Sequence, residues 1–159
     1  MPSDKNIFSQ YPNPYFVETG SYMGDGIQKA IDSGFENIIS IKLSYKYYEI
    51  CKNKFMSNGN VTIVQGDSYK VLQEILSPIN NKITFWLDGY HSCGDTALGE
   101  CWSPLMKEIE VIGTHKIKEH TIIIDDVRCW RNYNQTHGFD INDIIEGIKK
   151  INDDYTFTY

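Results

Sequence analysis

The sequence predicts one α/β domain in which a mainly parallel sheet lies between two layers of helices. Three observations support this prediction. Short runs of β-branched and aromatic residues alternate with segments whose apolar residues recur at helical spacing. Most of the short runs are almost continuously apolar, as is typical of strands that are buried on both faces. The chain has 159 residues, a length that suits one domain with one hydrophobic core.

Five of the short runs are expected to form the sheet, and a sixth strand-like run follows near the end of the chain. Parallel neighbours require a crossover segment, so each connection should carry a helix that packs on the sheet. The expected architecture is therefore a Rossmann-like three-layer sandwich that occupies residues 1–159 as one domain. The expected strands are Tyr15–Glu18, Asn37–Leu43, Val61–Gln65, Ile83–Asp88 and Thr121–Asp125, with Tyr155–Tyr159 as the sixth run.

Apolar stripes with a period near 3.6 residues mark the segments between the strands. We interpret every stripe as core packing, because one helix face must cover the sheet. In chain order the stripes are Ile27-Ala30-Ile31, Tyr47-Tyr48-Cys51-Phe55, Val71-Leu72-Ile75-Leu76, Trp102-Leu105-Ile109-Ile112 and Ile141-Ile144-Ile145-Ile148-Ile151.

The composition narrows the classes of function. The formal net charge is −6, so the chain as a whole should not attract nucleic acid or an acidic membrane surface. No apolar run approaches the roughly 20 residues of a membrane span. The four cysteines show no Cys-x-x-Cys spacing, so we expect reduced thiols and a cytoplasmic protein.

A glycine-rich turn follows the first expected strand and is the strongest sign of a ligand site. Ligands of such sheets bind beyond the carboxyl ends of the strands, and Gly20, Gly24 and Gly26 would let the backbone bend there. Glu18 and Asp25 flank the turn, and their charges suit a cationic ligand better than the pyrophosphate of a dinucleotide. A dinucleotide-dependent reductase is thus disfavoured, and a tight turn with a surface acid is the alternative without a ligand.

The segment Glu18–Gly24 resembles the first motif of the class I S-adenosylmethionine-dependent methyltransferases, in a variant with an aromatic residue at its centre. The resemblance implies that S-adenosylmethionine (SAM) is the cofactor. It implies that the loop holds the methionine end of SAM through Glu18, Gly20 and Gly24, with Ser21 and Tyr22 as further cofactor-binding residues.

The second strand departs from this family. Its members usually place an acid there that bonds both ribose hydroxyls, whereas this chain has Lys42. An ammonium group cannot accept a hydrogen bond, and loss of a charged bond costs about 1.5–3 kcal/mol. Either the ribose is held in another way, or cofactor binding is weakened. A methyltransferase-fold binding or structural module without catalysis is therefore the alternative function.

The third strand is followed by Gln65-Gly66-Asp67-Ser68. By resemblance, Asp67 and Ser68 are cofactor-binding residues near the adenine. The alternative is that either residue only caps the next helix.

Acids also close the fourth and fifth expected strands. Asp88, Asp125 and Asp126 could together hold a hard cation such as Mg²⁺, which would lower the pKa of a substrate hydroxyl. The arrangement resembles the metal-dependent sugar O-methyltransferases of the macrocin type. That resemblance implies these three acids as ligands, a small hydroxylated acceptor, and Asp88 and His91 as catalytic residues. Alternatively, Asp88 contacts only cofactor or substrate, and the other two acids bond loop amides.

The end of the chain is shorter than the family pattern. Members usually finish with a helix and a β-hairpin, and here only one strand-like run follows the last helix. We therefore expect an incomplete hairpin and an exposed strand edge, through which the chain could form a homo-oligomer.

Overall fold

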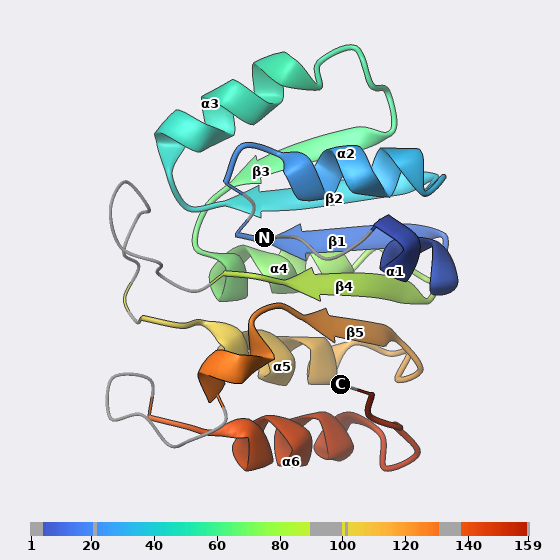
Figure 1. Ribbon diagram of the computed structural model, residues 1–159, viewed down its shortest axis with the longest axis vertical. Helices are drawn as coiled ribbons and strands as arrows, with labels where there is room; N and C mark the ends of the chain where they lie inside the picture. Colours follow the sequence, from blue (N-terminus) through green and yellow to red (C-terminus); the bar gives the residue numbers. More distant parts are fainter. Residues whose placement is uncertain (1–4, 21, 90–99, 101, 131–137, 159) are drawn as a thin grey trace.

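The computed structural model describes residues 5–20, 22–89, 100, 102–130 and 138–158. Within them a five-stranded sheet has the order β3-β2-β1-β4-β5, and every neighbouring pair is parallel (Figure 1). The predicted parallel α/β fold is confirmed. The strands are β1 (Tyr15–Thr19), β2 (Asn37–Lys42), β3 (Val61–Gln65), β4 (Ile83–Leu87) and β5 (Thr121–Ile124).

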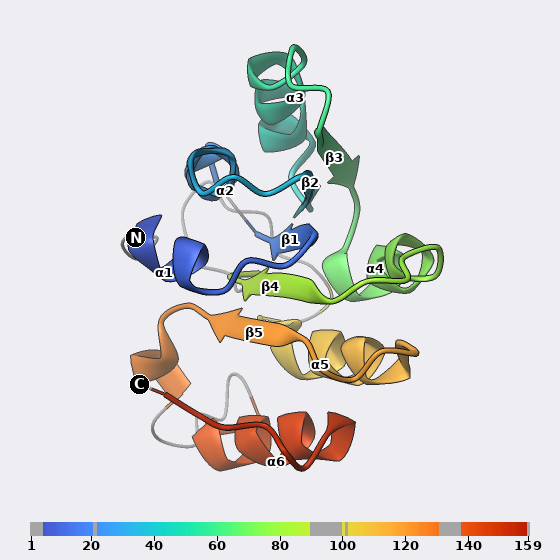
Figure 2. The ribbon, with the colours of Figure 1, turned by 90° about the vertical axis from the view of Figure 1, so that its right-hand side faces the viewer.

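Helices cover both faces of the sheet, which gives the three layers of the predicted sandwich (Figure 2). On one face, α1, α2 and α3 enclose a core with Phe16 and Trp86. On the other face, α4, α5 and α6 enclose a core with Val17 and Phe85. The helices are α1 (Lys5–Gln10), α2 (Asp25–Asp32), α3 (Tyr45–Lys54), α4 (Ser68–Leu76), α5 (Leu105–Thr114), the 3₁₀ helix η1 (Val127–Trp130) and α6 (Ile141–Ile151).

The two cores explain the continuous apolar runs. Successive side chains of a strand point to opposite faces, so Phe16 and Val17 enter different cores although they are neighbours. All five residues of β4 are buried. Full burial of a large apolar side chain stabilises the fold by roughly 1.5–3 kcal/mol, so the central strands contribute to both layers.

The expected strands were accurate to one residue at their carboxyl ends. Asp88 and Asp125 follow β4 and β5 instead of ending them. Their amides nevertheless extend the sheet: Asp88 N–H donates to Thr19 O at 3.1 Å and Asp125 N–H to Leu87 O at 3.1 Å. Both acids are thus held by their backbones beside neighbouring strands.

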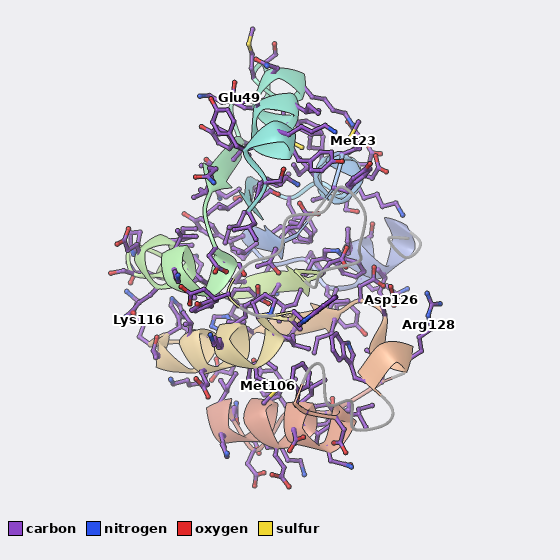
Figure 3. All side chains as sticks on the ribbon, turned by 90° about the vertical axis from the view of Figure 1, so that its left-hand side faces the viewer. Met23, Glu49, Met106, Lys116, Asp126 and Arg128 are labelled. Carbon is purple, nitrogen blue, oxygen red and sulfur yellow. The ribbon has the colours of Figure 1, made fainter. Side chains whose placement is uncertain are left out.

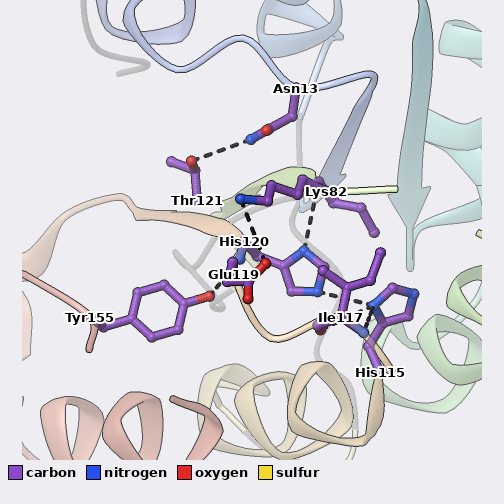
Figure 4. Close-up of polar contacts among 9 residues, drawn as sticks. Asn13, Lys82, His115, Ile117, Glu119, His120, Thr121 and Tyr155 are labelled. Atoms are coloured by element: carbon purple, nitrogen blue, oxygen red, sulfur yellow. Dashed lines mark hydrogen bonds and ion pairs between the residues drawn. The ribbon is translucent and has the colours of Figure 1, made fainter. Parts of the chain in front are cut away.

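The predicted sixth strand is wrong for residues 155–158, which form no strand. Tyr155 and Phe157 pack against the core of α4, α5 and α6 instead. The backbone N–H of His120 donates to the Tyr155 hydroxyl at 2.9 Å (Figure 4). Side-chain packing and two hydrogen bonds of Tyr155 hold the segment, because the Tyr155 amide also donates to Asn152 O at 3.3 Å. Within the described residues, β5 pairs with β4 alone. Over the same residues no helix has the length and hydropathy to span a membrane.

Candidate functional site

The carboxyl ends of the strands meet at one edge of the sheet, which we call the rim. The register aligns Thr19 with Ile41 and with Leu87, so the ends of β1, β2 and β4 are level. The first crossover leads from β1 to β2 on one side, and β4 lies on the other side of β1. Between β1 and β4 the winding reverses, and such switch points are where open α/β sheets bind ligands.

Gly20 lies against the backbone that leaves β4. Its φ is +86°, a left-handed conformation that favours glycine. A Cβ at this position would fall 2.1 Å from the Asp88 carbonyl oxygen and 2.6 Å from Gly89 Cα. The Gly20 amide donates to Ile41 O at 3.2 Å. The turn therefore needs glycine for both its conformation and its close approach.

Gly24 precedes α2 and serves packing within the same loop. Its φ is +84°, and a Cβ would lie 2.5 Å from Phe55 Cε2 and 3.2 Å from Cys51 Sγ. Met23 O accepts a bond from Lys54 Nζ at 3.1 Å, which ties the loop to α3. Tyr22, from the same loop, is 54% exposed, and its ring centroid lies 4.4 Å from that of Tyr47. Ser21 lies outside the described residues.

Glu18 is completely buried at the end of β1. Its Oε2 accepts a hydrogen bond from Ser40 Oγ at 2.7 Å. Its Oε1 occupies the space beside Gly26, where a Cβ would come within 1.8 Å of it. Gly26, the third glycine of the glycine-rich turn, thus accommodates the Glu18 carboxylate from within α2. A surface position for this acid, the alternative raised by the sequence, is excluded.

Lys42 turns into the protein at the end of β2. The side chain is 2% exposed, and its Nζ lies 3.9 Å from Glu18 Oε2. Cys51 of α3 is near Lys42: burial raises the pKa of the Cys51 thiol, and the lysine charge opposes that rise. The ammonium group is therefore balanced by an internal carboxylate.

Asp67 and Ser68 differ from their predicted capping roles. Asp67 is the N-cap of α4, but its side chain makes no capping bond, and partial burial raises its pKa. Ser68 is the first residue of α4, and its hydroxyl donates to Glu108. Capping by Ser68 is therefore wrong.

Glu108 of α5 is a residue that the sequence analysis missed, and it is fully buried. A signal was present, because an acid occurs three residues after Leu105 and four before Ile112 on the buried face of α5.

Asp88 and Asp125 form a pair of acids at the rim. Burial raises the pKa of Asp88 to about 7, and repulsion from Asp125 and then Glu18 adds to the effect. Burial also raises the pKa of Asp125, whose Oδ1 accepts from the Asp126 amide at 2.8 Å. This bond matches the loop-amide alternative for Asp125. An acid with a pKa near 7 can exchange a proton at neutral pH.

Asp126 forms an ion pair with Arg128. It has a φ of 51°, and its Oδ1 lies 2.6 Å from Arg128 Nη2. Figure 3 shows the two side chains beside each other after β5. Among the described residues, no group of three His, Cys, Asp or Glu side chains could hold a metal ion, so the three predicted ligands do not form a metal site there. His91, the other predicted catalytic residue, lies outside the described residues.

Comparisons with known proteins locate the fold. Neither a protein-family model nor a curated protein matches the sequence. Among solved structures, the O-methyltransferase TomG from Streptomyces achromogenes, involved in tomaymycin synthesis and solved with SAM, matches with a TM-score of 0.61 and 9% identity. The match covers 94% of this chain and 64% of TomG, so the chain spans just under two thirds of that protein.

Two further solved structures are similar. A candidate caffeoyl-CoA O-methyltransferase from Staphylococcus aureus matches with a TM-score of 0.56 and 11% identity over 94% of this chain and 67% of its own. A candidate rRNA methylase from Clostridium thermocellum matches with a TM-score of 0.56 and 12% identity over 96% and 80%. At these identities the likeness concerns the fold alone. The chain has the Rossmann-like α/β fold of SAM-dependent methyltransferases.

Proposed function

We propose that the chain binds SAM at the rim between β1 and β4 and transfers the methyl group to an oxygen of a small hydroxylated acceptor, such as a sugar. The observation that carries the proposal is the close approach of Gly20 to the Asp88 backbone. This approach puts the glycine-rich turn beside the pair of acids at the rim, Asp88 and Asp125. Such a turn lets a ligand approach the backbone closely, and the acids favour a cation.

The residues at the rim fit a sulfonium cofactor. The SAM sulfonium would supply an electrophilic methyl group that needs little further activation. Gly20, Tyr22 and Gly24 would hold its methionine end, together with Ser21. Glu18 would support the loop from beneath, because its buried carboxylate accepts from Ser40 and is paired with Lys42. Asp67 and Ser68 would lie on the adenine side.

Asp88 is the proposed general base. A carboxyl with a pKa near 7 is partly ionised at neutral pH and accepts a proton more readily than an ordinary carboxylate. Removing the hydroxyl proton of the acceptor makes its oxygen a better nucleophile toward the methyl group. His91 is proposed as a second catalytic group. No step of the proposal uses Mg²⁺, because Asp125 and Asp126 have protein partners.

Lys42 sets a condition on the binding mode. The ribose hydroxyls need acceptors, and an ammonium group offers none. Because Lys42 is balanced by Glu18, we propose that it supports the floor of the site and that the ribose is held by other groups. The net charge of −6 favours a small acceptor over a nucleic acid.

Titration calorimetry with SAM and S-adenosylhomocysteine (SAH) tests the binding step. Gly20→Ala should abolish binding, because the methyl group would displace the Asp88–Gly89 backbone. Gly34→Ala is the matched control: Gly34 has a φ of +83°, so it shares the backbone strain, yet nothing lies within 4 Å of a Cβ there. The proposal is refuted if the unmodified chain gives no heat with millimolar ligand.

The transfer step needs its own measurement. Release of SAH in the presence of hydroxylated acceptors, sugars first, should depend on Asp88 and fall with Asp88→Asn. Binding of SAM without turnover on any acceptor would instead support the binding module that the sequence left as the alternative.

Self-association through the outer edge of β5 is part of the proposal. That edge makes no ladder to a further described strand, and unpaired strand edges can accept another strand. Light scattering over a range of concentrations should show a dimer. The Asp125 amide faces β4, so the N–H of Ile122, three residues earlier, faces the outer edge. Ile122→Pro should therefore leave a monomer if the edge is the interface.

A further inference from the structure

Glu108 lies beneath the rim, at a point where three chain segments of the candidate site meet. The residue is in the first turn of α5 and is 0% exposed. A carboxyl without access to water costs free energy unless its oxygens find partners. The partners of Glu108 belong to elements that are distant from one another in the sequence.

Each of the three segments reaches the same carboxyl. Ser68, at the start of α4, donates its hydroxyl to Glu108 Oε1. Thr19, at the end of β1, brings its hydroxyl beside the same carboxyl, where Thr19 Oγ1 and Glu108 Oε2 are both buried without a hydrogen-bond partner among the described residues. Gly89, just beyond β4, passes so close that a Cβ there would lie 3.1 Å from Glu108 Oε1 and 3.3 Å from Thr19 Oγ1. The carboxyl therefore touches the turns that follow β1, β3 and β4.

The chemistry of a carboxyl suits this position. Its two oxygens can serve two hydroxyl groups at once, which an apolar side chain of the same size cannot do. Burial raises the pKa of Glu108 to about 7 although both hydroxyls oppose the rise, so the group also carries a proton below neutral pH. Glu108 forms no ion pair within the described structure, so its burial costs folding free energy. The other buried residues of α5 include the apolar Leu105, Ile109 and Ile112.

We propose that Glu108 is a positioning residue that fixes the turns after β1, β3 and β4 in one arrangement for cofactor binding. The proposal rests on the proposed function for the ligand that these turns receive. Glu108 acts through Thr19, Ser68 and Gly89 and does not itself contact the cofactor. Substitution of Glu108 should therefore increase the mobility of all three segments together. Substitution of an ordinary core residue should affect only the segments that it contacts.

The test compares three variants of the whole chain. Glu108→Leu keeps the volume but leaves the Ser68 hydroxyl without its acceptor and the Thr19 hydroxyl beside an apolar side chain, and we expect SAH affinity to fall about tenfold or more. Glu108→Gln keeps an acceptor oxygen and should return affinity to within a few-fold of the unmodified chain. Ile112→Val is the control on the same buried face of α5, and it should reduce the melting temperature without changing affinity.

Amide hydrogen exchange by NMR supplies a readout that needs no cofactor. The Gly20 amide, bonded to Ile41 O, reports on the turn after β1. The Val71 amide, bonded to Asp67 O, reports on the turn after β3. The Asp88 amide, bonded to Thr19 O, reports on the end of β4. Exchange at all three should accelerate together in Glu108→Leu and recover in Glu108→Gln. Unchanged exchange in Glu108→Leu, or acceleration only at Val71, would overturn the proposal.

These readouts separate the two claims. If the unmodified chain binds no SAH, the proposed function fails, and the exchange pattern still decides the role of Glu108. If Glu108→Leu does not fold, Ser68→Ala removes one of the two hydroxyls instead. Acceleration at Gly20 in that variant supports the link through Glu108, and acceleration confined to Val71 rejects it.

Discussion

His115 Nδ1 lies 3.1 Å from His120 Nε2, and the two rings link backbone groups from separate parts of the fold (Figure 4). His120 Nδ1 accepts from Ile83 N–H at 3.2 Å, so neutral His120 carries its proton on Nε2. His115 Nδ1 accepts that proton's bond, and His115 Nε2 then donates to Ile79 O at 2.9 Å. Both rings are thereby assigned as neutral Nε2–H tautomers.

This histidine pair should make stability sensitive to acid. Burial, with the charge of His115, lowers the pKa of His120 to about 4, and Lys118 and Lys82 act in the same direction. The unfolded chain takes up the proton near pH 6.5. The contribution is thus complete above pH 6.5, decreases as the pH falls toward 4, and amounts to roughly 1–2 kcal/mol after allowance for solvent screening.

Asp88 and Glu108 act in the opposite sense over the same range, because their raised pKa values favour the folded state at low pH. The contribution of His120 is therefore measured as the difference in unfolding free energy between the unmodified chain and His120→Asn, by urea denaturation at pH 4 to 8. That difference in free energy should become smaller as the pH falls. A difference that is constant with pH would contradict the assignment.

Asp125→Asn should lower the pKa of Asp88, because it removes the largest charge that repels the Asp88 carboxylate. If Asp88 is the base, the rise of kcat/KM with pH should move to lower pH in this variant. Asp126→Asn is the control and should shift the profile less, since Asp126 contributes less to the Asp88 pKa. An unshifted profile in Asp125→Asn would remove Asp88 from the role of base.

Substitution of Lys42 should reveal the buried pair with Glu18. Lys42→Met leaves the Glu18 carboxylate buried without its cation and should cost about 3–5 kcal/mol of unfolding free energy. Lys42→Met combined with Glu18→Gln should cost less than Lys42→Met alone. Lys42→Glu, which would restore an acid on β2, should destabilise the chain instead of improving cofactor affinity, because it places two carboxyls together. Urea denaturation of the three variants measures these differences.

Gly26 and Gly113 offer a matched test of glycine in a helix. A Cβ at Gly26 would collide with Glu18 Oε1, whereas at Gly113 the nearest atom is Ile151 Cγ1 at 3.5 Å, an ordinary contact. Gly26→Ala should destabilise by about 1–3 kcal/mol. Gly113→Ala should stabilise by about 0.5–1 kcal/mol through helix propensity. Equal melting temperatures for the two variants would contradict the packing at Gly26.

The fold and the rim could be predicted from the sequence because they depend on patterns along the chain. Alternating apolar runs located the five strands, and the residues that follow a parallel strand must lie at one edge of the sheet. Gly20 and Asp88 were found in this way.

The direction of each side chain at the rim could not be predicted in the same manner. Lys42 and Glu18 are both at strand ends, yet they turn inward to each other, and Asp126 forms an ion pair with Arg128. Glu108 and the histidine pair depend on partners about 36 to 40 residues away, which no local pattern records. The run after α6 has the composition of a strand, but Tyr155 and Phe157 pack against the core without forming one.

The amides of Asp88 and Asp125 are bonded into the sheet, and this has a consequence for how a cation would be received. A hydrogen bond to a neighbouring strand holds the backbone of each acid, so its position is fixed before a ligand binds. The free-energy cost of bringing the carboxylates together is met when the chain folds, and it does not recur when a ligand binds. A field that is already oriented needs little rearrangement during a reaction, which is how folded proteins gain over water as a solvent for charge.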